Sequence, residues 1–238
     1  MSDLETLLQI QDKDTAIDRL RHRRATLPER SALSALEQRS ADLEARITET
    51  VARRDAVAAR QSRLEEEVGT LDARVKDIER RLYSGTVATS RDLQAMSAEV
   101  TSVKRRRSSL EDEVLVAMEE GEPLGHQLEA LAAERDALDA ESEGVRSALV
   151  EAEVVIDAEI EAESAARASI ARSVPEELMR TYEGLRARLD GIGAARLVGS
   201  SCSGCHLVLP SAEVVRVKRE PPDALIFCDQ CGRILVRS

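Results

Sequence analysis

The residues best suited to chemistry are four cysteines near the end of the 238-residue chain, arranged as two Cys-x-x-Cys pairs with 22 residues between them. Two such pairs supply four thiolates, which close a tetrahedral zinc shell and leave no position for water. Gly204 and Gly232 are expected to allow the tight turns that bring the sulfurs to one ion. The spacing therefore predicts one structural Zn²⁺, and its ligands are Cys202, Cys205, Cys228 and Cys231.

Other uses of these cysteines remain open: a thioredoxin-like redox pair, an iron–sulfur cluster, or free thiols. His206 directly follows the first pair, and we expect it at the surface or beside the ligands rather than on the metal. Disulfides are disfavoured because the acidic N-terminus, Met-Ser-Asp-Leu-Glu, is unlike a secretory signal. With no run of about 18 apolar residues, we expect a cytoplasmic protein without a membrane partner.

The elements that must position the cysteines cannot include a large globular core. The chain has no Trp, one Phe and two Tyr, and 33% of its residues are charged. Apolar residues recur in steps of three and four from Leu36 to Leu82, and again from Leu93 to Ile156. Such a mixture with heptad periodicity is typical of helices that pack in a coiled coil.

We therefore predict a mainly α fold, a long antiparallel coiled-coil helical hairpin that carries a small C-terminal β zinc ribbon. The hairpin covers residues 1–173, a short helix and linker cover 174–193, and the ribbon covers 194–238. Within the hairpin, the first arm spans 3–82, the turn 83–90 and the second arm 90–173.

Proline and glycine predict irregularities in both arms. Pro28 should kink the first arm, and Gly121 with Pro123 should break the second. Folding about residue 86 pairs positions whose numbers add up to about 172, which predicts that Glu65–Glu67 lie opposite Lys104–Arg107.

Several phrases of the sequence resemble a bacterial family of C4-type zinc-ribbon coiled-coil proteins. They are Leu82-Tyr83-Ser84-Gly85-Thr86-Val87, Leu110-Glu111-Asp112-Glu113 with Met118-Glu119, Val174-Pro175-Glu176-Glu177-Leu178, and Cys228-x-x-Cys231-Gly232-Arg233-Ile234-Leu235. The resemblance implies the same hairpin and zinc ribbon. Relatives in this family act as adaptors or chaperones in flagellar and type III secretion systems, where they bind sigma-54, export components or, in one lineage, messenger RNA.

No Ser/His/Asp set, open metal site or phosphate-binding loop can be assembled, so we expect neither enzymatic activity nor a small-molecule substrate. An adaptor or chaperone-like protein that binds protein partners fits best. Arg and Tyr are favoured interface anchors, and they gather at the predicted turn; alternatively, Tyr83 closes the turn and the arginines are solvated. These candidate residues are Arg80, Arg81, Tyr83 and Arg91.

The second function that fits is a regulator that binds RNA or DNA through the ribbon. Residues 111–174 carry 4 basic and 18 acidic side chains, which disfavours nucleic acid along that stretch. The ribbon has six basic and four acidic residues, and its one aromatic residue, Phe227, is expected to be buried. The candidate basic patch consists of Arg216, Lys218 and Arg219.

Overall fold

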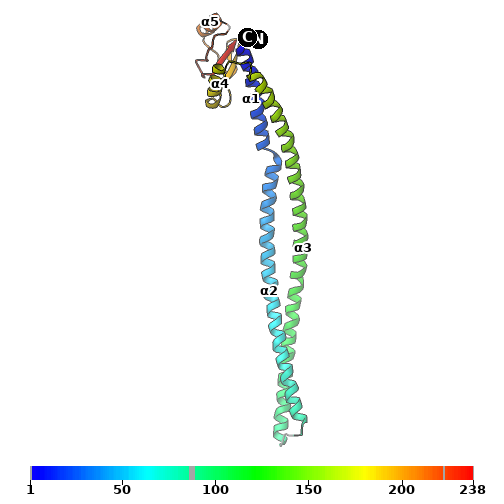
Figure 1. Cartoon of the computed structure of the whole chain (residues 1–238). Coiled ribbons are helices and arrows are strands. Elements are labelled where there is room, and N and C mark those ends of the chain that lie inside the picture. Colours follow the sequence, from blue (N-terminus) through cyan, green and yellow to red (C-terminus); the bar gives the residue numbers. More distant parts are fainter. Residues whose placement is uncertain (1, 86–88, 222, 238) are drawn as a thin grey trace. The chain divides into compact units, whose positions relative to one another are not determined.

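The computed structural model describes residues 2–85, 89–221 and 223–237. Its elements, shown in Figure 1, are mostly helical, with three short strands near the C-terminus, so the predicted fold class is confirmed. No described helix has both the length and the apolar character needed to cross a membrane. The elements are α1 (Asp3–Ala25), α2 (Pro28–Tyr83), α3 (Ser90–Ala171), α4 (Glu176–Arg188), β1 (Ala194–Val198), β2 (Ser201–Cys202), α5 (Ser211–Arg219) and β3 (Ile234–Arg237).

The chain divides into two compact units. The ribbon unit comprises Met1–Ala32 and Val145–Ser238, and the hairpin unit comprises Leu33–Gly144. Helices α2 and α3 each belong partly to both units. This division cuts across the three predicted segments because α1 contacts strands β1 and β3, which joins the start of the chain to the zinc ribbon.

Heptad spacing defines the packing of the hairpin unit, in which the cyan part of α2 runs antiparallel beside the green part of α3 (Figure 1). Helix α2 buries side chains at intervals of seven from Leu36 to Thr50, and again at Val75 and Ile78. Such recurrence forms a continuous seam between two helices. On the part of α3 that belongs to the hairpin unit, the buried apolar side chains are Val103, Leu110, Ala117, Leu124, Leu131 and Leu138, one in every heptad.

Ion pairs between the two helices establish the register of the hairpin unit. Most of them join positions whose numbers add up to about 180, so the predicted sum of about 172 is wrong. The heptad pattern cannot distinguish registers that differ by about one heptad, since the apolar residues stay in phase. Pairs that show the register are Arg39–Glu141 and Arg46–Glu134, both at 3.2 Å, and Arg60–Glu120.

The predicted charge match between Glu65–Glu67 and Lys104–Arg107 is wrong for the same reason. The Nζ of Lys104 lies 2.6 Å from a carboxylate oxygen of Glu79, and Arg107 pairs with Asp72 at 2.5 Å. These partners lie farther along α2 than the prediction placed them. Each exposed pair contributes only about 0.2–1 kcal/mol, so the pairs follow the seam rather than select it.

Proline acts differently in the two arms. Helix α1 ends at Ala25 and α2 begins with Pro28, a first-turn position where the missing N–H costs nothing. The predicted break near Gly121 is wrong, because α3 continues through Pro123. Ala117 and Leu124 are buried on either side of this region, so seam packing holds the helix together across the lost hydrogen bond.

The predicted turn includes residues 86–88, which lie outside the described residues. Helix α2 ends at Tyr83, and α3 begins at Ser90. The hydroxyl of Thr89 accepts a hydrogen bond of 3.2 Å from the backbone N–H of Asp92, as an N-cap does.

The ribbon sheet has the order β2-β1-β3, with β1 antiparallel to β2 and parallel to β3. Alternation along the strands gives the sheet two different faces. Ala194, Ile234 and Val236 join a core with Leu4, Leu7 and Tyr182, on the side of α1 and α4. Ala195, Leu197 and Leu235 join a smaller core with Val217 of α5 and two of the cysteines.

The register predicts which cysteine pair can be crosslinked within one chain. Arg53 and Gln127 line the same groove of the hairpin unit and follow the observed register. In zinc-loaded protein, Arg53→Cys with Gln127→Cys should react with a short bismaleimide, and peptide mapping should place the crosslink within one chain. Arg53→Cys with Glu119→Cys follows the rejected register. Glu119 is displaced by about 12 Å along α3 from the position of Gln127. Efficient crosslinking of this second pair alone would contradict the register.

Candidate metal centre and its attachment to α1

Two turns of the same form hold the four cysteines. The backbone N–H of Cys202 donates to the carbonyl of Leu207 at 3.1 Å, and that of Cys228 donates to the carbonyl of Arg233 at 2.9 Å. Each bond joins the first cysteine of a pair to the residue five positions later. The two Cys-x-x-Cys segments therefore fold alike.

The residue after each pair has a left-handed backbone: φ is 60° at His206 and 72° at Gly232. The expectation that Gly204 supplies a permissive backbone is wrong, because its φ is not positive. Gly204 is needed for space instead, since a Cβ atom there would lie 2.6 Å from Cδ of Arg233 and 2.9 Å from Cβ of Ala195. His206 itself is exposed, as expected.

The four sulfur atoms are arranged as a zinc ion requires. All four lie within 4.8 Å of one another, and no disulfide joins them. The Sγ atoms of Cys202 and Cys231 are 3.9 Å apart, and those of Cys205 and Cys228 are 4.0 Å apart. A tetrahedron with Zn–S bonds of about 2.3 Å has sulfur–sulfur edges of about 3.8 Å. The donor set and its geometry therefore fit Zn²⁺.

The thiols differ in how readily they lose their protons. Burial raises the pKa of Cys202, and it raises the pKa of Cys228 to about 12. Burial also acts to raise the pKa of Cys231, but hydrogen bonds from the backbone and side chain of Arg233 outweigh it and lower this pKa to about 7. Zinc must displace these protons when it binds, so zinc affinity falls as the pH falls.

Arg233 joins the metal centre to the turn after α4. Its Nε donates to the carbonyl of Ile192 at 2.9 Å, and its Nη2 donates to the carbonyl of Leu189 at 3.1 Å. The same guanidinium brings positive charge to four thiolates that carry a net charge of minus 2 with zinc. The sequence indicated only that Arg233 is one of several basic residues of the ribbon.

Gln11 of α1 holds the segment that enters β1. Its side-chain oxygen accepts from the backbone N–H of Gly193 at 2.7 Å and of Ala194 at 3.2 Å, and its amide donates to the carbonyl of Gly191 at 3.0 Å. Gln11 is 5% exposed. A buried amide with its hydrogen bonds satisfied fixes the position of the strand relative to the helix.

Asp14, one helical turn further along α1, connects three helices. Its carboxylate accepts from Tyr182 Oη of α4 at 2.7 Å and from Arg167 Nε of α3 at 2.9 Å, and Arg186 Nε lies 3.6 Å away. Burial, followed by the bond to Asp14, raises the pKa of Tyr182, so the phenol remains a donor.

Only glycine fits at position 193, where a Cβ atom would lie 2.8 Å from the Tyr182 ring.

Gln11 and Asp14 were not predicted from the sequence, although a signal was present. Leu4, Leu7, Gln11 and Asp14 follow one another in steps of three and four, so two polar residues occupy an apolar helical stripe. Polar groups at such positions indicate a specific buried partner.

The predicted interaction residues belong to the hairpin unit and are all exposed. Tyr83 is 82% exposed, and Arg80 lies 3.6 Å from Asp77. Among the described residues, neither Arg81 nor Arg91 forms an ion pair.

The predicted basic patch of α5 is only partly available. Arg216 pairs with Asp229 at 3.2 Å, whereas Lys218 and Arg219 are exposed and form no ion pair within the described part of the chain. The expectation that Phe227 is buried is wrong, since it is 40% exposed. Its neighbour Ile226 fills the small core instead, and alternation along the extended segment turns Phe227 outward.

Loss of one cysteine should separate the stability of the ribbon from that of the helices. Cys228→Ser should reduce zinc from one equivalent per chain and unfold the segment after residue 193, because the small core near α5 cannot replace the metal. Helical circular dichroism should change little, since the hairpin seam is independent of zinc. Metal analysis and limited proteolysis measure these effects. A fully protected ribbon in metal-free protein would contradict the assignment.

Loss of the Asp14 carboxylate should destabilise the ribbon unit without removing zinc. Asp14→Ala leaves Arg167 and Tyr182 without their shared acceptor, and breaking a buried ion pair typically costs about 3–5 kcal/mol. Chemical denaturation should show this loss while zinc content stays at one equivalent. Glu161→Ala, at an exposed position of α3, is the control and should change the unfolding free energy by less than about 0.5 kcal/mol.

Comparison with known proteins agrees with this architecture. Uncharacterized protein Rv2229c of Mycobacterium tuberculosis is 29% identical over 232 residues, which cover 98% of this chain and 94% of the relative. Uncharacterized protein ML1638 of Mycobacterium leprae is 24% identical over 221 residues, which cover 93% of this chain and 94% of the relative.

Solved structures show the same fold. A protein from Mycobacterium smegmatis superposes with a TM-score of 0.90 at 23% identity, covering all of both chains. CT398 from Chlamydia trachomatis superposes with a TM-score of 0.75 at 20% identity, and the match covers 99% of this chain and 98% of the CT398 chain. HP0958 from Helicobacter pylori superposes with a TM-score of 0.53 at 18% identity, and the match covers 99% of this chain and 97% of the HP0958 chain.

Two families match the chain along most of its length. Residues 201–235 match the C4-type zinc ribbon domain, which together with the cysteine cluster confirms the predicted structural zinc site. Residues 10–190 match the CT398-like coiled coil hairpin domain. The chain therefore belongs to the CT398-like coiled-coil hairpin family and carries a C4-type zinc ribbon at its C-terminal end.

Proposed function

We propose that this protein is a non-enzymatic, chaperone-like adaptor that binds protein partners through the end of its hairpin. The observation that carries the proposal is the exposure of Tyr83. This side chain is 82% exposed at the last residue of α2, so it contributes little to the stability of the hairpin. Tyrosine is among the residues that contribute most at protein interfaces.

The charged neighbours of Tyr83 support the same role. Arg81 and Arg91 are exposed, and neither has a carboxylate partner among the described residues. Some arginines of the hairpin unit are engaged across the two helices, as in Arg46–Glu134 and Arg74–Glu99, while Arg53 and Arg105 form no ion pair with a described residue. Arginines left unpaired beside an exposed tyrosine suit a partner with acidic and aromatic or apolar groups.

The resemblance to secretion-system adaptors suggests which protein partners to test first. An alternative sigma factor of the sigma-54 class and export components are the two classes that it implies. Binding to either would refine the proposed function, which itself requires only that the hairpin end contacts a protein.

Nucleic-acid binding by the ribbon is the second candidate function. Two observations favour it: Lys218 and Arg219 are unpaired within the described residues, and Phe227 is 40% exposed. Cations attract phosphates, and an exposed aromatic ring can stack on a base. The pairing of Arg216 with Asp229 reduces the positive charge of this surface.

Two sets of variants distinguish these functions. Reversing Arg80, Arg81 and Arg91 to Glu should remove at least one protein partner from affinity purifications made with cell lysate. Folding and zinc content should be unchanged, because exposed substitutions alter stability by no more than about 0.5 kcal/mol. Arg105→Glu, at an exposed position of the same unit, is the matched control and should keep every partner.

The second set neutralises Arg216, Lys218 and Arg219 and is tested against mixed RNA and DNA at near-physiological salt. If the adaptor proposal is right, this set leaves protein partners bound. Retention of all partners by the first set, together with a fall in nucleic-acid affinity and in its salt dependence for the second, would replace the adaptor with a nucleic-acid-binding function.

A further inference from the structure

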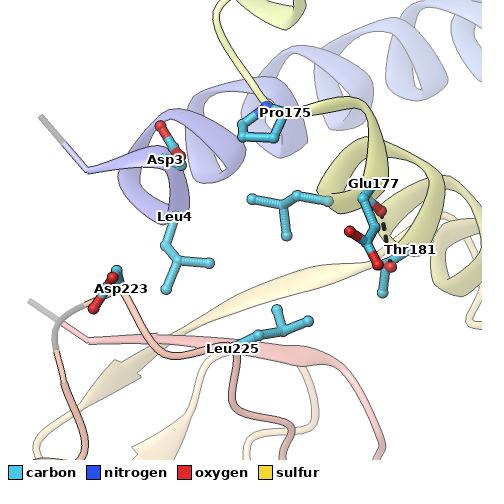
Figure 2. Close-up of a pocket in the computed structure, with 8 residues that line it drawn as sticks. Asp3, Leu4, Pro175, Glu177, Thr181, Asp223 and Leu225 are labelled. Carbon is cyan, nitrogen blue, oxygen red and sulfur yellow. Dashed lines mark hydrogen bonds between the residues drawn. The ribbon is translucent and has the colours of Figure 1, made fainter.

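We infer that a pocket of the ribbon unit binds an arginine or lysine side chain presented by a protein partner. The pocket lies between the first turns of α1 and α4 and the loop that precedes Phe227 (Figure 2). This inference rests on the proposed adaptor function and specifies the chemistry of one partner.

The pocket has an apolar floor. Its volume is about 270 Å³, and its apolar lining comes from Leu4, Leu178, Leu225 and Pro175. Figure 2 shows the side chains of Leu4 and Leu225 directed into the same space from α1 and from the ribbon loop. Leu225 is 42% exposed, so apolar surface in this pocket is open to water. A ligand with aliphatic carbons would cover it.

The rim of the pocket carries charge of one sign. Asp3, Glu177 and Asp223 line it, and among the described residues no Lys or Arg does. None of these three carboxylates forms an ion pair with a described residue, whereas Asp14 and Asp157, in the same unit, each pair with arginine. Figure 2 places the three carboxylates around the leucines. The pocket therefore attracts a cation that the described chain does not supply.

Helix stability accounts for only part of this arrangement. Asp3 and Glu177 lie in the first turns of α1 and α4, where a carboxylate interacts favourably with the helix dipole. Asp223 belongs to a loop and has no such role. Helix stability therefore does not account for the combination of an apolar floor and an acidic rim.

An arginine or lysine side chain matches both parts of the pocket. Its aliphatic stem can pack on the leucines while its charged head reaches the carboxylates at the rim. A guanidinium adds the planar geometry that carboxylates bind in a bidentate manner. A wholly apolar group would bury carboxylates without a partner, which is unfavourable. Phosphate groups, and with them nucleic acid, are repelled by the same charges.

The direct test uses zinc-loaded, full-length protein with isotope-labelled leucine methyl groups. The probes are the capped tripeptides Leu-Arg-Leu, Leu-Lys-Leu and Leu-citrulline-Leu, where citrulline keeps the shape of arginine but lacks its charge. The arginine and lysine peptides should shift the methyl signals of Leu4, Leu178 and Leu225. The citrulline peptide should bind at least about tenfold more weakly, a difference of about 1.4 kcal/mol.

Variants show whether the rim is responsible. The double variant Glu177→Gln with Asp223→Asn should bind the arginine peptide at least about fivefold more weakly. Its fold should be unaltered, since both residues are exposed. Glu161→Gln removes an exposed carboxylate of the same unit outside the pocket and should have no effect. Equal binding of the citrulline peptide, unchanged binding by the double variant, or no shift at millimolar peptide would each overturn the inference.

This test is separate from that of the proposed function. If the pocket fails to bind arginine while reversal of the hairpin arginines removes a partner, the adaptor function stands and the pocket inference falls. If the pocket binds arginine but the hairpin variants keep every partner, the pocket is retained and the role of the hairpin end is wrong.

Discussion

The carboxylate of Asp14 is where the helices of the ribbon unit meet. It accepts hydrogen bonds from Tyr182 of α4 and Arg167 of α3, and it is almost fully buried. A buried carboxylate is costly unless its partners are correctly placed, so this arrangement selects one packing of α1, α3 and α4 over others. Gln11 extends the selection to the sheet, because its side-chain amide binds the backbone of Gly191 and Gly193, before β1, and of Ala194, the first residue of β1. The path of the chain into the metal centre thus depends on two polar side chains of the first helix.

The metal centre in turn supplements the small core of the ribbon on the side of α5. The face of the sheet toward α5 has only a few medium-sized apolar residues, and its one aromatic neighbour, Phe227, points outward. Zinc binding by the four thiolates supplies the folding free energy that apolar burial on this face does not provide. Arg233 connects this centre to the carbonyls of Leu189 and Ile192, so the site is attached to the turn after α4 as well as to the sheet. Zinc binding and the packing of α1 therefore stabilise the same unit from its two sides.

In the hairpin unit, burial and charge have separate roles. The apolar residues that recur every seven positions provide the attraction between α2 and α3. The cross-helix ion pairs are exposed and individually weak, and they follow the register that the seam sets. Both surfaces that we propose to be functional lie where these requirements end. Tyr83 lies at the end of a helix, and the pocket lined by Leu225 and Asp223 lies at a loop, so both are free of the demands of the seam.

The sequence by itself determined the fold class and the metal ligands. Heptad spacing specifies helices that must bury a stripe, and two Cys-x-x-Cys pairs specify a closed zinc shell, because both signals are local repeats. The register was decided only by the tertiary structure, since a shift of about one heptad leaves the pattern unchanged. The same holds for the continuity of α3 through Pro123, where packing on both sides outweighs one lost hydrogen bond. The roles of Gln11 and Asp14 also required the structure, because their partners lie more than 150 residues away along the chain and no local spacing connects them.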